Sequence, residues 1–239
     1  MIKNIAILGS SGAIGSAFTF HLSFRYPEAN IHAFSRNINK TLPTNINYHL
    51  IDYSNEESIK SSALIASKTG PLDMVIVATG ILHEGLLTPE KSLQNLSAEK
   101  FKRLFEVNTI VPALIAKHFL PILNKKNQSI FAALSARVGS ISDNRLGGWY
   151  AYRASKSALN MVIKTCSIEM VRLNKKAIVV GLHPGTVDSS LSKPFQTNVP
   201  PNKLFSPTYS AENLLQVLLS LTPAQSGKCF DWNGVEIEP

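Results

Sequence analysis

After four residues the chain runs Ile5-Ala6-Ile7-Leu8-Gly9-Ser10-Ser11-Gly12-Ala13-Ile14-Gly15, a short apolar stretch that leads directly into a glycine-rich turn. Apolar residues then recur at helical spacing from Ile14 to Leu22. A strand, a glycine turn and a helix in this order are typical of a dinucleotide-phosphate turn, because glycine lets the backbone approach a pyrophosphate at the helix N-terminus. An ordinary tight turn is the alternative. The candidate contacts are Gly9, Ser11, Ala13, Ile14 and Gly15.

The rest of the chain repeats this alternation of strand and helix. Further strands are expected at 31–34, 48–51, 72–77, 130–134, 177–182 and 228–232, and helices at 55–67, 98–119, 150–173 and 211–221. The pattern predicts the α/β class: one doubly wound Rossmann-type domain over residues 1–239, with a parallel sheet of about seven strands and helices on both faces. The Pro- and Ser-rich stretch 183–207 is too irregular for regular structure and is expected to be a substrate or cofactor loop.

Composition narrows the classes of partner. The chain has 239 residues, of which 44% are hydrophobic and 17% charged, so it can bury a sizeable core. No apolar run reaches the ~18 residues of a membrane span, and the first is too short for a signal peptide, so a cytoplasmic protein with no membrane partner is expected. Cys166 and Cys229 have neither the number nor the spacing of a metal site or a disulfide framework. The net charge of +8 is scattered, which argues against nucleic acid and is compatible with a phosphorylated cofactor.

The ends of the second, third and fourth expected strands carry further cofactor candidates. No acidic residue follows the second strand, where NAD-binding folds bind a ribose 2′-hydroxyl. Arg36 stands there and suits a 2′-phosphate, so NADP(H) is the expected cofactor and NAD(H) stays open; a surface arginine is the alternative. Asp52 is a candidate acceptor for the adenine amine, or else a turn residue. Ala78-Thr79-Gly80 places a glycine where the chain would pass close to a cofactor.

Tyr152 and Lys156 lie four residues apart in an expected helix, so their side chains project from one face. A phenol titrates near pH ~10, and a nearby ammonium lowers that pKa by favouring the phenolate. Such a tyrosine would exchange a proton near neutral pH, as the interconversion of a carbonyl and an alcohol requires. A tyrosine and an unrelated surface lysine can have the same spacing by chance, so the pair indicates a catalytic site only together with the other motifs.

Together these motifs resemble the short-chain dehydrogenase/reductases over essentially the whole chain. The order is the glycine turn, Ala78-Thr79-Gly80, Asn108 in a long helix, Tyr152 with Lys156, and His183-Pro184-Gly185. The entry to the helix expected at 150–173, Gly147-Gly148-Trp149-Tyr150-Ala151-Tyr152-Arg153-Ala154-Ser155-Lys156-Ser157-Ala158-Leu159-Asn160, is most similar to the C-factor/sniffer-type carbonyl reductases.

The resemblance implies roles for individual residues. Tyr152 would donate the proton to a carbonyl in reduction, and Lys156 would lower its pKa and bind the nicotinamide ribose. Asn108 would hold a water molecule in a proton relay. The segment Pro184-Gly185-Thr186-Val187 would pass beside the nicotinamide, with Val187 binding its carboxamide through the backbone. Ser189 would contact the pyrophosphate.

The chain departs from the family pattern at several positions. Ala13 stands where a glycine is usual, and Val77-Ala78-Thr79-Gly80 replaces the common Asn-Asn-Ala-Gly. The serine that normally binds the substrate carbonyl falls on Ala136. Ser135 is adjacent, and Ser140 lies 12 residues before Tyr152; we favour Ser135 as the catalytic serine. If no hydroxyl reaches the carbonyl, the loss is on the order of 10²-fold in turnover.

The sequence therefore favours an NADP(H)-dependent oxidoreductase that interconverts a carbonyl and an alcohol on a small-molecule substrate. Leu191, Phe195 and Val199 in the expected loop suggest an apolar substrate. The alternative is a dinucleotide-binding, C-factor-like signalling or sensor protein with little catalysis. A sugar-nucleotide epimerase also uses Tyr-x-x-x-Lys, but it usually needs a larger C-terminal domain than the residues left after 182.

The resemblance also implies a homodimer or homotetramer, because helices bearing the residues equivalent to Asn108 and Tyr152 commonly pair across a two-fold axis in this family. Phe119, Met161 and Met170 are apolar residues beyond those that one buried face requires. Packing in the core is the alternative for each of them.

Overall fold

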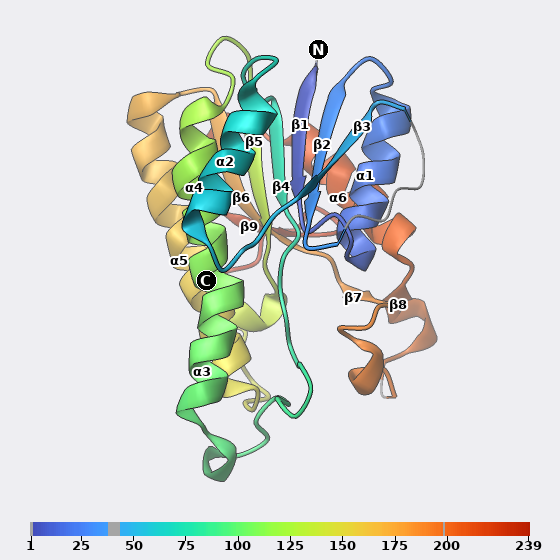
Figure 1. Cartoon of the computed structure of the whole chain (residues 1–239). Coiled ribbons are helices and arrows are strands. Elements are labelled where there is room, and N and C mark those ends of the chain that lie inside the picture. The colour runs from blue at the N-terminus through green and yellow to red at the C-terminus, as the bar shows by residue number, and fades with distance from the viewer. Residues whose placement is uncertain (1, 38–43, 198) are drawn as a thin grey trace.

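The computed structural model describes residues 2–37, 44–197 and 199–239. A parallel sheet of seven strands in the order β3-β2-β1-β4-β5-β6-β9 runs through the protein (Figure 1). Its strands are β1 (Asn4–Leu8), β2 (Asn30–Ser35), β3 (Ile46–Leu50), β4 (Met74–Val77), β5 (Ser129–Leu134), β6 (Ala177–His183) and β9 (Cys229–Asp231). The predicted doubly wound α/β fold is confirmed. The chain order reverses between β2 and β4, the two neighbours of β1, and ligands bind such sheets at the carboxyl ends of the strands beside this point.

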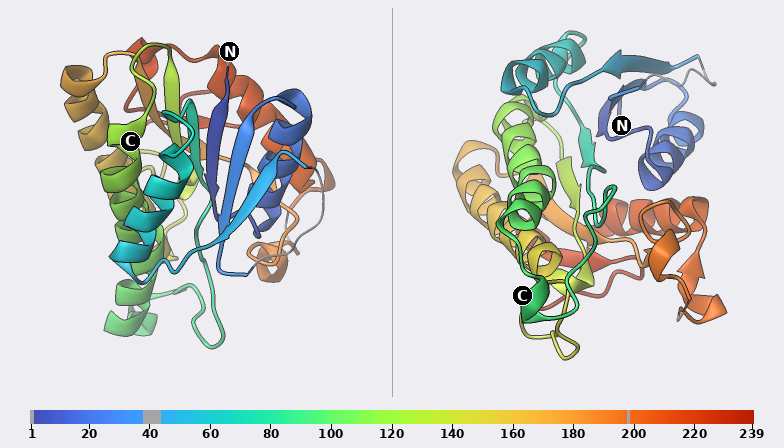
Figure 2. Two further views of the ribbon diagram at one scale, coloured as in Figure 1. Left: turned by 45° about the horizontal axis from the view of Figure 1, so that its top comes forward. Right: turned by 60° about the horizontal axis from the view of Figure 1, so that its bottom comes forward.

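Helices cover both faces of the sheet. On one face lie α1 (Ala13–Arg25) and α6 (Pro207–Ser220), and on the other lie α2 (Glu56–Ser67), α4 (Val111–Phe119) and α5 (Tyr150–Leu173) (Figure 2). Alternate residues of β1 explain the two layers, because Ile5 and Ile7 pack in the core with Phe18 of α1, whereas Leu8 packs in the other core with Ile115 of α4. Full burial of each such side chain stabilises the fold by about 1.5–3 kcal/mol.

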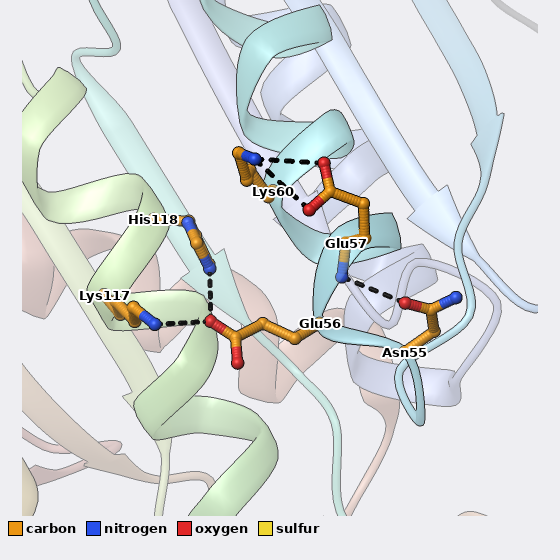
Figure 3. A network of polar contacts seen from close by, with 6 residues as sticks. All are labelled: Asn55, Glu56, Glu57, Lys60, Lys117 and His118. Atoms are coloured by element: carbon orange, nitrogen blue, oxygen red, sulfur yellow. Dashed lines mark hydrogen bonds and ion pairs between the residues drawn. The ribbon is translucent and has the colours of Figure 1, made fainter.

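Polar contacts at the start of α2 fix this helix against α4 (Figure 3). The side chain of Asn55 caps α2 by accepting a hydrogen bond from the Glu57 backbone N–H at 3.0 Å. Glu56 forms ion pairs with Lys117 and His118 of α4, and hydrogen bonds from these two residues lower the pKa of its carboxyl. The pair of helices forms part of the layer beneath β1 and β4.

The helix expected over residues 98–119 is interrupted. It consists of α3 (Ala98–Phe105), one π-helical turn (Glu106–Ile110) and α4. The Val111 N–H donates to the carbonyl oxygen of Glu106, five residues back, which defines the wider turn. Pro112 has no N–H to offer the carbonyl of residue 108, so an unbroken α-helical ladder cannot form here. The turn carries Asn108, which is fully buried.

The stretch 183–207 contains more regular structure than the sequence predicts. Two short parallel strands, β7 (Thr186–Val187) and β8 (Leu204–Phe205), pair outside the main sheet. Strands of two residues are too short to show a periodic pattern. Helix α6 begins at Pro207, four residues before the expected position, because Ser206 caps it by accepting the Tyr209 N–H at 3.1 Å.

Figure 1 shows α3 and the β7–β8 segment extending beyond the sheet at the carboxyl ends of its strands, on opposite sides. Phe119 and Met170, considered above as interface residues, are buried in the core, whereas Met161 on α5 is exposed. Within the described ranges, no helix is long and apolar enough to cross a membrane.

Candidate active site

A continuous cleft lies at the carboxyl ends of the strands. Two cavities of about 430 and 390 Å³ adjoin there. Both are lined by Gly12, Ala78, Thr79 and Gly80, so they share a wall at the end of β4. The first cavity extends to Arg36 and the second to Tyr152. The cleft is therefore at the switch point at which the fold favours ligand binding.

The glycine turn is shaped by contacts that leave no room for side chains. Gly9 has a φ of +90°, and a Cβ on it would lie 2.9 Å from the carbonyl carbon of Ala78. A Cβ on Gly15 would lie 2.2 Å from the carbonyl oxygen of Gly9. Gly9 and Ser11 line the first cavity, and Ala13 and Ile14 line the second; Gly15 lines neither and supports the turn from behind.

The far end of the first cavity holds the two candidates for the adenosine half of a cofactor. Arg36 is exposed and lines the cavity. Asp52 also lines it, and its Oδ1 accepts hydrogen bonds from the Ser54 hydroxyl at 2.6 Å and the Ser54 N–H at 2.9 Å. These two bonds lower the pKa of the Asp52 carboxyl. Asp52 therefore stabilises the turn after β3 and also lines the cavity, so the two interpretations of this residue are compatible.

Arg103 is a cavity residue that sequence reasoning missed. It lies on α3, lines the first cavity, and its guanidinium binds Glu84 in a bidentate ion pair at 2.8 and 3.1 Å. A third bond, at 3.2 Å, joins it to Glu106. The sequence offered no signal, because a basic residue on a helix is most often a solvated one.

Tyr152 and Lys156 lie together in the second cavity and are nearly completely buried. Both start from the first turns of α5 and share one face of it, as their spacing predicts. The Lys156 Nζ lies 5.9 Å from the centre of the Tyr152 ring and donates to the Leu134 carbonyl oxygen at 2.8 Å. A Cβ on Gly80 would lie 3.5 Å from the same Nζ, which shows how closely β4's end approaches the lysine.

The pKa values of this pair contradict the direction expected from the sequence. Burial raises the pKa of Tyr152 to about 12 and lowers that of Lys156 to about 8. The loss of solvation outweighs the attraction between phenolate and ammonium, which lie on one helix face without direct contact. In this arrangement the phenol keeps its proton at neutral pH and is available as a donor.

Asn108 joins the end of β4 to the π-helical turn and lines neither cavity. Its Oδ1 accepts from the Ile81 N–H and its Nδ2 donates to the Ile81 carbonyl oxygen, both at 2.9 Å. Nδ2 also donates to the Ser155 hydroxyl on α5 at 3.2 Å. The buried amide thereby fixes three segments that meet beside Gly80.

The serine candidates have other partners. The Ser135 hydroxyl, although the residue lines the second cavity, donates to Asn160 Oδ1 at 2.6 Å. The Ser140 hydroxyl accepts from the Asp143 N–H at 3.1 Å and lies outside the described cavities. Ala136 packs in one apolar cluster with Tyr152. The side chain that residue 136 contributes to this cluster is therefore a methyl group and carries no hydroxyl.

The segment after β6 forms the opposite wall of the second cavity. Pro184, Gly185, Val187 and Ser189 line it, as do the three apolar loop residues, Leu191, Phe195 and Val199. Gly185 has a φ of +75°, and a Cβ there would lie 2.5 Å from the Phe205 ring, so only glycine fits. Trp149 completes the wall and was not among the predicted site residues.

Comparison with known proteins agrees with this geometry. A family model described as short chain dehydrogenase matches residues 3–200. The chain belongs to the short chain dehydrogenase family. Within this family it is 32% identical to C-signal of Myxococcus xanthus over 71% of this chain and 93% of that protein. It is 31% identical to 1-hydroxy-2-glutathionyl-2-methyl-3-butene dehydrogenase of Rhodococcus sp. strain AD45 over 74% of each chain.

Solved structures of short chain dehydrogenases and reductases share the whole fold. Carbonyl reductase Sniffer of D. melanogaster superposes with a TM-score of 0.86 at 22% identity, covering all of both chains. An NADPH-bound carbonyl reductase from chicken fatty liver superposes with a TM-score of 0.85 at 22% identity, covering 100% of this chain and 99% of that one. At this identity the likeness establishes the fold, and the resemblance noted from the motifs is confirmed at the level of the family.

Proposed function

We propose that the protein is an NADP(H)-dependent oxidoreductase that interconverts a carbonyl and an alcohol, with Tyr152 as the acid and base. Membership of the short chain dehydrogenase family supports a dehydrogenase or reductase role. The observation that carries the proposal is the burial of Tyr152 and Lys156 together at the inner end of a cleft that begins at the glycine turn.

The residues present fit a dinucleotide. Gly9 and Gly80 line the cleft without side chains, and the buried hydroxyl of Thr79, which lines both cavities, has no hydrogen-bond partner among the described residues. Gly9, Ser11, Ala13 and Ile14 would hold the pyrophosphate, with Ser189 from the other wall. The similar structure described as NADPH-bound, the carbonyl reductase from chicken fatty liver, supports the choice of the phosphorylated form.

Arg36 would hold the 2′-phosphate and Asp52 the adenine amine, whereas Lys156 would bind the nicotinamide ribose. Pro184, Gly185 and Val187 would border the nicotinamide. The cofactor, when bound, supplies or accepts a hydride.

Tyr152 would give its proton to the oxygen of the substrate in reduction. A phenol with a pKa raised to about 12 by burial holds that proton at neutral pH and can donate it in the direction of reduction. Asn108 would position a proton relay to Tyr152, because it is hydrogen-bonded both to the segment after β4 and to α5. That it holds a water molecule in this relay stays a prediction. The segment 183–207 would cover the substrate with Leu191 and Phe195.

Replacement of Tyr152 by Phe tests the proposal. The variant keeps the buried ring and removes only the hydroxyl, so we expect NADPH binding to be retained and carbonyl reduction to fall by roughly 10²–10⁴-fold. Tyr150→Phe, two residues earlier on the same helix and outside the cleft lining, is the matched control. Turnover that is unchanged in Tyr152→Phe would refute the role of Tyr152.

A second candidate function is a dinucleotide-binding signalling or sensor protein with little catalysis. Ala136 beside Tyr152 and the 32% identity to C-signal favour it. NADPH binding without turnover of any carbonyl in a broad panel would support this candidate against the first.

We also propose a homodimer or homotetramer. The support is the exposed apolar side chains of Met161, Ile168 and Val171 on α5. Sedimentation equilibrium would give the number of subunits.

A further inference from the structure

The turn that begins α5 has an unusual backbone. Gly147, Gly148 and Trp149 have φ angles of +63°, +65° and +52°, three left-handed residues in succession. Glycine adopts this conformation without steric cost, but Trp149 does not. Among the described residues it is the one non-glycine residue with a positive φ. Such strain persists only where the surroundings impose it, and it is concentrated at functional sites.

Hydrogen bonds made by two residues, Glu90 and Arg153, hold this conformation. The Trp149 N–H donates to the backbone carbonyl oxygen of Glu90 at 2.6 Å, and the Ala151 N–H donates to Glu90 Oε2 at 3.2 Å. Arg153 Nε donates to the carbonyl oxygens of Gly148 at 3.0 Å and Gly147 at 3.2 Å. The turn is thus held by the Glu90 backbone carbonyl on the Trp149 N–H, by the Glu90 carboxylate on the Ala151 N–H, and by the Arg153 guanidinium on the carbonyls of the two glycines.

Burial of the Glu90 carboxylate costs more free energy than capping a helix requires. It is 1% exposed, and its Oε1 has no hydrogen-bond partner among the described residues. A short side chain such as Ser or Asn caps a helix without burying a carboxylate oxygen that lacks a donor. This cost indicates that Glu90 does more than cap the start of α5. Its hydrogen bonds hold in place the turn that carries Trp149.

The indole that this turn presents forms a wall beside the proposed acid. Its ring centre lies 6.2 Å from that of Tyr152 and 5.2 Å from that of Phe195, both in edge-to-face arrangements. All three rings line the second cavity together with Leu191 and Val138. Trp149 comes from the start of α5 and Phe195 from the segment after β6, so their contact joins two separate stretches of the cavity lining beside Tyr152.

We propose that Trp149 is a specificity-determining residue that takes a planar aromatic group on the substrate next to its carbonyl, and that Glu90 is the positioning residue that fixes the indole. The inference rests on the proposed function. The edges and faces that Trp149 and Phe195 offer suit another ring, because aromatic pairs prefer edge-to-face and offset contacts. A small aliphatic carbonyl would reach Tyr152 without using this wall.

The test compares two probe substrates with NADPH, 1-phenyl-1,2-propanedione and 2,3-butanedione. Trp149→Asn removes the ring and keeps a residue that tolerates the left-handed conformation. We expect a KM about tenfold higher for the phenyl compound, with kcat and KM for butanedione within about threefold. Leu146→Asn, an exposed position in the same loop, is the control and should change neither substrate.

A double-mutant cycle tests the role of Glu90. The quantity compared is kcat/KM for 1-phenyl-1,2-propanedione divided by kcat/KM for 2,3-butanedione. Glu90→Ala should lower this ratio by about as much as Trp149→Asn does. When Trp149 is already Asn, adding Glu90→Ala should lower the ratio by less than about twofold further. Glu90→Gln keeps an acceptor oxygen for the Ala151 N–H and should retain the wild-type ratio; it also serves if Glu90→Ala fails to fold. Independent, multiplying effects of the two substitutions on the ratio would overturn the positioning role.

Binding separates this inference from the proposed function. If the wild type reduces neither dione, calorimetric titration of the NADPH-loaded protein with 1-phenyl-1,2-propanedione still tests the aromatic site. Binding that weakens about tenfold in Trp149→Asn supports the inference although the proposed activity fails. An unchanged ratio of the two substrates, or unchanged binding, in Trp149→Asn overturns the inference and leaves the proposed activity standing.

Discussion

The two ends of the cleft are built in different ways. At the turn end, the shape comes from backbone, since Gly9 and Gly15 bring two segments closer than any side chain would permit. At the other end, Asn108 is distant in the chain from Tyr152 and Lys156, and the arrangement depends on the packing of α5 against the sheet and the π-helical turn. The first end is specified locally and the second by tertiary structure, so the two should respond differently to substitution.

The largest effect should come from the turn end. Gly15→Ala would place a Cβ 2.2 Å from the Gly9 carbonyl oxygen, and because both partners are backbone the turn must shift. Overpacking of this kind costs about 3 kcal/mol, so we expect NADPH binding to weaken by roughly 10²-fold or more, with a lower Tm. Titration with NADPH and thermal unfolding measure the two effects.

Gly12→Ala is the matched control in the same turn. Its Cβ would lie 3.4 Å from the Gly9 carbonyl oxygen, at the limit of an ordinary contact, and its φ is −74°. We expect NADPH affinity within about threefold of the wild type. If the two glycines behave alike, backbone contact does not determine this end of the cleft.

The second-largest effect concerns the Tyr152 end of the cleft, where side-chain hydroxyls should affect catalysis more than backbone contacts do. Ala136→Ser would add a hydroxyl in the cluster that contains Tyr152, and we expect a gain in kcat of about tenfold, since one carbonyl donor contributes on the order of 10²-fold in a preorganised site. Ser135→Ala should lower kcat by less than about threefold, because that hydroxyl is bonded to Asn160. A large loss in Ser135→Ala, with no gain in Ala136→Ser, would restore Ser135 as the catalytic serine.

How far the sequence predicts the molecule follows the same division. The order of strands and helices and the glycine turn follow from periodicity and local steric rules, and they match the structure. The pKa of Tyr152 was expected to fall and instead rises, because the extent of burial is a property of the assembled fold. The break in the helix at Asn108 follows from Pro112, a local signal that the apolar periodicity does not show, whereas the strands β7 and β8 depend on pairing between separate segments. Trp149 is visible in sequence only as an aromatic residue, and its left-handed backbone is not.

The third effect concerns cofactor choice at the turn end. Arg36→Ala removes an exposed guanidinium from the cavity wall, so we expect the Kd for NADPH to rise about tenfold and that for NADH to stay within about twofold. Lys60→Ala, an exposed cation on α2 paired with Glu57, controls for net charge. Equal changes for both nucleotides would remove Arg36 as the residue that selects the 2′-phosphate.

The smallest effect is a pH dependence of stability at the Tyr152 end. Burial lowers the pKa of Lys156 from 10.5 to about 8, so between pH 8 and 10.5 the unfolded chain binds more protons at this residue than the folded one. The buried charge therefore costs stability below pH 8, by about 3 kcal/mol at most, and this cost disappears as the pH rises through that window. Lys156→Met removes the charge and keeps a side chain of similar length, although it leaves the Leu134 carbonyl without its donor.

We expect the Tm of Lys156→Met to exceed that of the wild type by about 5 °C at pH 7, and this difference in Tm to close by about pH 10.5. Calorimetry of both proteins across this range measures the gap, in which the titrations of all other groups cancel. A gap that stays constant with pH would mean that Lys156 is not a buried charge in the folded protein, and the two ends of the cleft would then differ less in their electrostatics than the structure indicates.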